Sequence, residues 1–176
     1  MKITASSVKR FLMGYGLVLF LLGVIGYKLV TTYIPLWMFA SDLEGQDISA
    51  MMIQDESGRM VPLSTFRGAP LILNFWASWC LPCKVELPQL ASVYPDLVGQ
   101  GKKLLAVNVQ EDWQTINTFR KDMELPFPVY RDQGKLTGRL GISIIPALAV
   151  ISSEGKIVTV VYGYRPWVGW YLKWWV

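Results

Sequence analysis

The two cysteines of this chain are the residues whose type and spacing indicate chemistry. Cys80 and Cys83 are separated by two residues and follow the apolar run Leu71–Trp76. A buried strand that leads at once into a helix would place Cys80 in the first helical turn, where free backbone N–H groups and the helix dipole favour a thiolate. Lowering a thiol pKa from about 8.5 to about 7 raises the thiolate fraction at neutral pH from roughly 3% to roughly half. The spacing therefore predicts a redox-active pair with a nucleophilic first cysteine.

Three alternative interpretations of the cysteine pair are open. A zinc site needs four ligands, and without histidine or a third cysteine the chain would have to share the ion between two copies or recruit carboxylates. A purely structural disulfide would close a very short loop, where stabilisation through chain entropy is least. Two unrelated buried thiols are the third alternative. We favour the redox interpretation over all three.

The residues around the pair resemble a known active site. The segment Phe75–Lys84 (FWASWCLPCK) is similar to the active-site segment of thioredoxin-fold proteins. The segment Trp79–Pro88 (WC-x-PCK-x-E-x-P) most resembles the membrane-anchored TlpA/ResA/CcmG (DsbE-like) thiol-disulfide oxidoreductases. The resemblance covers roughly residues 40 to 165. It implies an α/β thioredoxin fold, in which helices flank a central mixed β-sheet, and the activity of a protein thiol-disulfide oxidoreductase.

The resemblance also assigns roles to individual residues. Cys80, at the exposed start of the helix, would be the nucleophile, and Cys83, one turn in and buried, would resolve the mixed disulfide. Pro146 resembles the cis proline that faces the cysteines of thioredoxin-fold proteins, and Ile145 before it would offer backbone groups to an extended substrate. Trp79 would be an exposed flank of the nucleophile. The alternatives are an ordinary proline at a strand edge and an ordinary packed tryptophan.

Two acidic residues are candidates for the proton transfer that thiol exchange requires. In thioredoxins a buried aspartate occupies the place of Asn74, and an amide cannot shuttle a proton. The TlpA/ResA-like proteins have acids that match Glu86 and Glu111. Glu86 follows Cys83 by three residues and so lies on the same helical face, where desolvation would raise its pKa and let it deprotonate the resolving thiol. The alternative is that both carboxylates are ordinary solvated surface groups.

The N-terminal part of the chain predicts a membrane anchor. The mean hydropathy of +0.33 is high for a soluble domain. A helix over Phe11–Ile34, which is apolar except for Lys28, would be about 36 Å long and could cross a bilayer core of about 30 Å. Lys and Arg without acids in residues 1–10 place that end in the cytoplasm. A cleaved signal peptide is the alternative, although Met38–Ala40 lacks the small-x-small pattern of a cleavage site.

The charge distribution separates the anchor from the rest of the chain. Of the 17 basic residues four lie in the first 28, which leaves 13 against 13 acidic residues in a neutral exported part. Nothing in that balance indicates a surface for nucleic acid. We therefore expect residues 35–42 to be a linker and residues 43–176 to be a thioredoxin-like domain outside the bacterial inner membrane, in the periplasm or its equivalent.

The elements expected around the cysteine pair alternate between strands and helices, which indicates a parallel βαβ core. Strands are expected at Leu71–Trp76, Lys103–Val109, Val129–Arg131, Ala147–Ile151 and Lys156–Tyr162, and helices at Leu81–Leu97, Trp113–Met123 and Lys135–Leu140. An N-terminal hairpin at the edge of the sheet would join Ser49–Ile53 to Met60–Leu63. The segment Val129–Leu140 corresponds to the inserted βα element of the resembled family. The sheet should be mixed.

The C-terminal segment Tyr164–Trp175 departs from the resembled family, whose last helix is usually longer and less aromatic. It contains four tryptophans. The first interpretation is a short terminal helix that starts near Pro166 and packs on the sheet. The second is an interfacial patch that lays the domain on the bilayer, because Trp and Tyr favour that depth.

The expected function is reduction of disulfides in other exported proteins. The resemblance implies electrons from a membrane thiol donor of the DsbD/CcdA type and apocytochrome c as the leading substrate, with copper-stress or general thiol repair behind it. The expected redox centre is the Cys80–Cys83 disulfide itself, with no cofactor and no metal. A disulfide oxidase of the same fold is the alternative within the class. A copper- or haem-carrying module is the alternative from another class, and the absence of histidine argues against it.

Overall fold

The structure, a computed structural model, describes residues 16, 18, 20–28 and 43–175. Residues 1–40 and 41–176 form two separate compact units. In the first unit the described residues are helical. Within the described residues no helix combines the length and the apolar character that crossing a membrane needs. The predicted anchor Phe11–Ile34 lies largely outside the described residues, as do the predicted cytoplasmic residues 1–10 and linker 35–42, and all three stay predictions.

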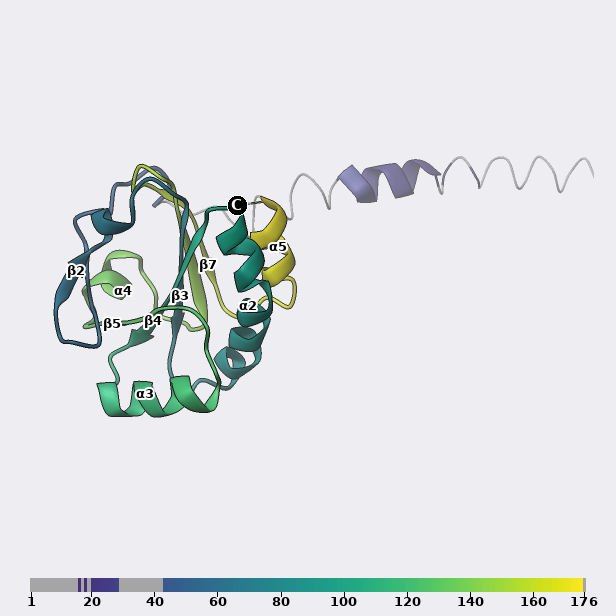
Figure 1. Cartoon of the computed structure of the whole chain (residues 1–176). Coiled ribbons are helices and arrows are strands. Elements are labelled where there is room, and N and C mark those ends of the chain that lie inside the picture. Colours follow the sequence, from purple (N-terminus) through teal and green to yellow (C-terminus); the bar gives the residue numbers. More distant parts are fainter. Residues whose placement is uncertain (1–15, 17, 19, 29–42, 176) are drawn as a thin grey trace, which may run out of the picture. The chain divides into compact units, whose positions relative to one another are not determined.

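A mixed β-sheet organises the second unit (Figure 1). Its strand order is β2-β1-β5-β4-β3-β6-β7. The strands are β1 (Met52–Gln54), β2 (Met60–Pro62), β3 (Leu71–Trp76), β4 (Lys103–Val109), β5 (Val129–Asp132), β6 (Ala147–Ile151) and β7 (Ile157–Tyr162). β3, β4 and β5 are parallel, whereas β6 pairs antiparallel with β3 and the β1–β2 hairpin forms the far edge. The predicted mixed sheet with a hairpin at its edge is therefore confirmed.

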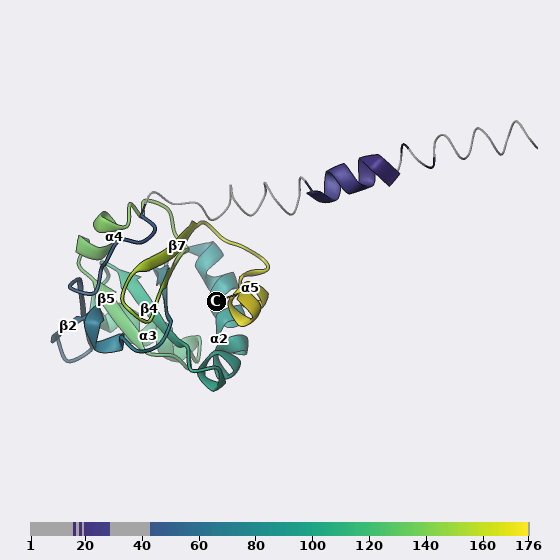
Figure 2. The same cartoon turned by 90° about the horizontal axis from the view of Figure 1, so that it is seen from above.

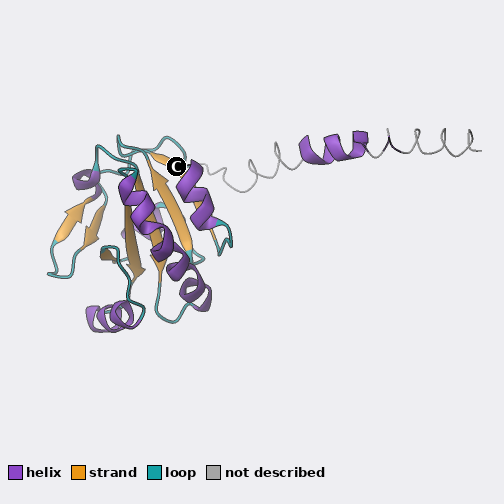
Figure 3. Cartoon of the chain, turned by 45° about the vertical axis from the view of Figure 1, so that its right-hand side comes forward, coloured by secondary structure: helices purple, strands orange, loops and turns teal. Residues whose placement is uncertain are grey.

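Helices cover both faces of the sheet (Figures 2 and 3). The helices of this unit are η1 (Leu63–Phe66), α2 (Leu81–Gly99), α3 (Trp113–Asp122), α4 (Lys135–Arg139) and α5 (Val168–Trp175). Side chains of β3 alternate between the faces, because successive residues of a strand point to opposite sides. Ile72 and Trp76 pack with α2, α3 and α5, and Leu73 and Phe75 pack with η1 and α4.

β3 and α2 form the central unit of the fold. All six residues of β3 are buried, as expected for a strand that is covered on both faces. α2 follows after a short loop and continues through Pro88 and Pro95, each of which lacks the N–H of a helical hydrogen bond. The packing of α2 compensates for these missing hydrogen bonds. Leu87 and Leu90 are fully buried, and burial of such a side chain contributes about 1.5–3 kcal/mol.

The inserted βα element is present where the sequence placed it. β5 lies parallel to β4, and α4 follows it on the face opposite α2. The buried Asp132 at the end of β5 fixes the start of α4, since its carboxylate accepts hydrogen bonds from Leu136 N (3.1 Å), Thr137 N (2.8 Å) and Thr137 Oγ1 (2.7 Å). The predicted boundaries of β5 and α4 are each within one residue of the observed ones.

The terminal helix α5 differs in part from the prediction. It begins at Val168, two residues after Pro166, and it lies along α2 as well as against the sheet (Figure 1). Gly169 permits this approach, because a Cβ at that position would lie 3.2 Å from Val93 Cγ1 of α2. An ion pair between Lys173 and Asp96 (2.7 Å) fixes the other end of α5.

Candidate active site

The cysteines lie where β3 ends and α2 begins. Cys80 is the N-cap residue of α2, and its Sγ accepts a hydrogen bond from Cys83 N at 3.2 Å. The two side chains form a disulfide in this structure. When that bond is reduced, the same N–H faces the Cys80 sulfur and favours its thiolate, as do the other free N–H groups of the first turn. The predicted position of Cys80 at the helix start is confirmed.

The exposure of the site differs from the sequence prediction. Cys83 is fully buried as expected, but Cys80 exposes only 4% of its surface. The exposed surface at the helix start belongs instead to the neighbours of Cys80, with Trp79 68% and Leu81 73% exposed. An apolar rim therefore surrounds a nearly closed disulfide, and a substrate disulfide has to displace or pack against this rim to reach the sulfur.

The segment before β6 completes the site from the other side. The peptide bond between Ile145 and Pro146 is cis, as the resemblance implied. Ile145 packs against the core cluster that contains both cysteines, and the Pro146 carbonyl accepts a hydrogen bond from Gly163 N (2.8 Å). No backbone hydrogen bond joins Ile145 to another described residue. Its N–H and C=O are thus available for an extended chain, which is the geometry of strand addition.

Glu86 lies one helical turn beyond Cys83, and it is only 3% exposed. Its Oε2 accepts a hydrogen bond from Asn74 Nδ2 at 2.8 Å. Burial raises the pKa of Glu86 to about 7, although the Asn74 hydrogen bond and the backbone N–H and charge of Arg165 act in the opposite direction. This carboxyl, one helical turn from Cys83, can therefore exchange a proton near neutral pH.

Glu111 holds the loop that precedes the nucleophile. Its carboxylate accepts hydrogen bonds from Ser78 N (2.8 Å), Ser78 Oγ (2.5 Å) and Asn108 Nδ2 (2.6 Å). Ser78 is two residues before Cys80, so these contacts fix the path of the chain from β3 into α2. This geometry gives Glu111 a positioning contact, and the proton-transfer role expected from the sequence stays a prediction.

A surface hollow of about 510 Å³ lies beside the cysteine segment. Ser78 and Lys84 line one side of it, and Asp112, Thr115 and other residues of α3 line the opposite side. The Lys84 ammonium lies 5.9 Å from the centroid of the Phe119 ring, which is a cation–π distance. Lys84 therefore points toward α3, and the hollow is lined by charged side chains of both signs.

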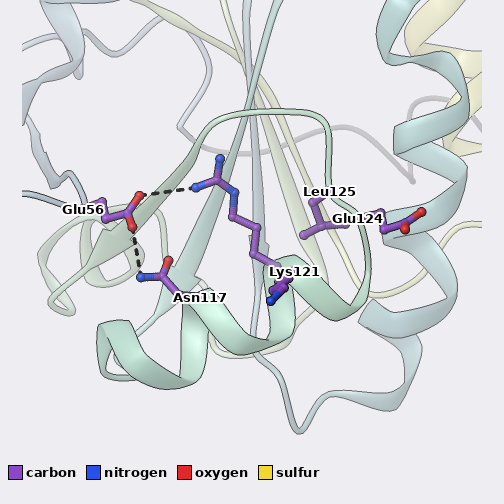
Figure 4. A pocket seen from close by; sticks show the side chains of 6 residues that line it. Glu56, Asn117, Lys121, Glu124 and Leu125 are labelled. Atoms are coloured by element: carbon purple, nitrogen blue, oxygen red, sulfur yellow. Dashed lines mark hydrogen bonds and ion pairs between the residues drawn. The ribbon is translucent and has the colours of Figure 1, made fainter.

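A second hollow, of about 420 Å³, lies between the β1–β2 turn and α3 (Figure 4). Glu56 of the turn accepts a hydrogen bond from Asn117 (3.1 Å) and pairs with Arg120 (3.4 Å). No residue of the cysteine segment lines this hollow. The contacts of Glu56 connect the edge hairpin to α3.

Two parts of the site could not be located from the sequence. Asn74 was recognised as a polar residue within a buried strand, but its donation to Glu86 joins residues 12 apart on different elements. Arg165 gave no local signal, because it follows β7 and reaches Glu86 only through the fold. Among the described residues, no group of three His, Cys, Asp or Glu side chains could hold a metal ion.

The fold and the site together define a thioredoxin-fold dithiol protein: the central strand of a mixed sheet leads into a cysteine pair at a helix start, and a cis proline precedes the neighbouring strand. The chain belongs to the AhpC/TSA family, whose model matches residues 44–160. Relatives named thiol-disulfide oxidoreductase place it among these enzymes.

The named relatives cover most of the chain. Thiol-disulfide oxidoreductase ResA of Bacillus subtilis (strain 168) is 33% identical over 88% of this chain and 86% of its own length. ResA of Geobacillus thermodenitrificans (strain NG80-2) is 30% identical over 88% of each chain. The crystal structure of StoA from Bacillus subtilis superposes with a TM-score of 0.61 at 30% identity, covering 74% of this chain and 98% of its own.

Proposed function

We propose that the chain is a membrane-anchored reductase of disulfides in exported proteins, with Cys80 as nucleophile and Cys83 as resolving cysteine. Anchoring rests on the apolar segment Phe11–Ile34 and the basic residues before it. Location on the outer side of a bacterial inner membrane follows from the same charge asymmetry. The observation that carries the catalytic part is the buried Glu86, whose pKa near 7 serves a buried resolving thiol.

The first step of the proposed reaction is attack of the Cys80 thiolate on one sulfur of a substrate disulfide. The substrate S–S bond breaks, a mixed disulfide with Cys80 forms, and the leaving substrate sulfur takes up a proton. The exposed side chains of Trp79 and Leu81 contact the substrate, and the free backbone groups of Ile145 pair with its extended chain.

The second step releases the substrate. The Glu86 carboxylate removes the proton from the Cys83 thiol, and the resulting thiolate attacks the Cys80 sulfur. The Cys80–Cys83 disulfide forms, and the substrate departs with its second thiolate, which is protonated in turn. Two electrons have then passed from the dithiol to the substrate, and a membrane dithiol donor of the DsbD/CcdA type would restore the reduced pair.

A resolving-cysteine variant tests this assignment. Cys83→Ser leaves the nucleophile intact but removes the group that releases the substrate, so mixed disulfides with exported proteins should accumulate. Cys80→Ser is the matched control and should trap none, because the buried Cys83 cannot reach a substrate. Mass spectrometry of the adducts names the substrate, with apocytochrome c expected first and copper-handling or other thiol proteins second. Equal trapping by both variants, or no adduct from either, would overturn the assigned roles and favour a metal- or haem-carrying module.

The redox potential tests the direction of the reaction. A reductase should have a potential near that of thioredoxin, about −270 mV, whereas an oxidase should lie near DsbA, about −120 mV. The gap corresponds to about 7 kcal/mol for a two-electron couple, so equilibration with glutathione separates the two cases. A value above about −150 mV would assign the chain to the oxidases of the same fold.

A further inference from the structure

Helix α5 presents two tryptophans away from the core. Trp170 is 59% exposed and Trp174 is 66% exposed, and because the two residues are four apart they lie on the same side of the helix. Val168 and Leu172, also four apart, lie on the opposite side and are 5% and 0% exposed. We refer to the exposed pair as the tryptophan face. It plays no part in the dithiol site, which lies at the other end of α2.

Two lysines lie on or against α5. Lys173, between the two tryptophans, has its ammonium 2.7 Å from Asp96 and 5.8 Å from the centroid of the Trp174 ring. Lys102 donates a hydrogen bond to the Leu172 carbonyl at 3.0 Å. Indole rings combine a large apolar surface with an N–H donor, and together with lysine they are the residues that gather where apolar and aqueous phases meet.

The chain enters the domain beside this helix. Gly45 N donates a hydrogen bond to the Ile157 carbonyl at 2.8 Å, so the first described residues of the domain run along β7. Tyr171 of α5 and Val158 of β7 line one apolar hollow of about 260 Å³. Burial and, after it, the negative charge of Glu44 raise the pKa of Tyr171, which is consistent with this proximity.

We propose that the tryptophan face lies in the headgroup region of the bilayer that holds the chain's own anchor. This proposal rests on the proposed membrane anchoring. The linker 35–42 would span at most about 26–29 Å when fully extended, so the end of the domain at which the chain enters cannot move far from the membrane surface. That end carries α5, and amphipathic tryptophan and lysine side chains favour the headgroup depth over water.

The test uses the full chain in nanodiscs of phosphatidylcholine and phosphatidylglycerol, prepared with or without lipids that are brominated near the headgroup end of the acyl chain. Bromine quenches tryptophan fluorescence only at short range. The double variant Trp170→Phe, Trp174→Phe keeps the apolar surface but removes the two fluorophores. The fluorescence that brominated lipid quenches should fall by about a third to a half relative to the unsubstituted chain, because both indoles lie at the quencher's depth.

Trp79→Phe is the matched control, since Trp79 is 68% exposed but lies at the cysteine end of α2. It should leave the quenched fluorescence unchanged. Equal quenching in the double variant and the unsubstituted chain would overturn the proposal. If Trp170 and Trp174 were shielded from solvent in native membranes but not in nanodiscs, that result would also overturn the proposal. It would assign the tryptophan face to a protein partner.

Two further measurements on the same samples keep this proposal separate from the proposed function. Reduction of a model protein disulfide should be unchanged in the double variant, so a loss of activity in all samples would count against the reductase and not against the tryptophan face. Co-elution of the chain with the discs reports the anchor. A chain that does not co-elute contradicts both the anchor and the tether on which the tryptophan face depends.

Discussion

Glu86 is subject to opposing influences, of which burial is the largest. Burial favours its neutral form, and the Asn74 amide, which donates to Oε2, favours the carboxylate. Because the balance leaves the pKa at about 7, the neutral and ionised forms are both well populated at neutral pH. In the proposed mechanism this group accepts a proton from Cys83 during resolution and returns it when the disulfide is reduced again. Asn74 would then be a positioning residue for an acid that takes the place of the buried aspartate of thioredoxins.

Replacing Glu86 with glutamine should slow release of the substrate. Glutamine keeps the size and one acceptor of the side chain but accepts no proton, so the resolution step at pH 7 should fall about 10²-fold. Stopped-flow kinetics of mixed-disulfide decay measures this step, and its pH dependence near 7 should vanish in the variant. Glu124→Gln, at an exposed position of α3's C-terminal turn, is the control and should leave the rate unchanged. A Glu86→Gln variant that resolves at the unsubstituted rate would remove Glu86 from the mechanism.

The same substitution should change how stability depends on pH. The pKa of Glu86 is 4.5 in the unfolded chain and about 7 in the folded protein. The contribution of such a carboxyl to stability is fully present below pH 4.5 and is lost as the pH rises through about 7. The free energy of unfolding of Glu86→Gln relative to the unsubstituted protein should therefore increase between pH 4 and pH 8, by on the order of 3 kcal/mol. Urea denaturation of the oxidised proteins at the two pH values measures the change. A difference independent of pH would contradict the raised pKa.

Helices and strands whose boundaries depend on neighbouring residues in the sequence were predicted best. The strands β3, β4 and β6 were predicted to the residue, because each is an apolar run bounded by turn-forming residues. The first cysteine was placed at the helix start for the same reason. The predicted packing of α5 on the sheet is confirmed, but its contact with α2 was not predicted, since that contact depends on the missing side chain of Gly169 and on the distant Val93. The near-complete burial of Cys80 was missed because exposure at a helix start is decided by neighbours from other elements.

Asp132→Ala should destabilise the inserted element more than removal of an ordinary helix cap. Asp132 is 1% exposed, and its loss leaves the N–H groups of Leu136 and Thr137 buried without an acceptor, at a cost of about 3 kcal/mol. Asp112→Ala is the matched control, because Asp112 is an exposed cap of α3 and its loss costs about 1 kcal/mol. Urea denaturation compares the two variants. Equal losses of stability would show that the buried carboxylate adds nothing beyond a surface cap.

For the whole molecule, the fold of residues 43–175 followed from the sequence and its resemblance, whereas the membrane anchor rests on composition alone. The predicted anchor depends on a run of apolar side chains in the N-terminal segment, which is separate from the domain. Charge balance points the same way, because the basic excess is confined to the N-terminal residues. Fractionation therefore tests a claim that the domain structure does not address.

The chain should stay in the membrane fraction after high-salt washing. Salt screens interactions between exposed charges but does not weaken burial of an apolar span such as Phe11–Ile34. Carbonate and high-salt extraction followed by immunoblotting measures retention. A variant with arginine at Leu21 and Leu22 is the control and should appear in the soluble fraction. Recovery of a soluble mature form that starts near Ser41 would replace the anchor with a cleaved signal peptide.

Helix α2 also sets a lateral separation. Its 19 residues rise about 28 Å, with Cys80 at one end and the contacts with α5 along the other half. Because α5 lies along α2 (Figure 1), a tryptophan face that rests on the lipid would lay α2 along the bilayer surface as well. Cys80 would then lie to one side of the tryptophan face, displaced along the surface by a distance on the order of the helix length. The proposed membrane dithiol donor would have to approach Cys80 from the side, and not from beneath the tryptophan face.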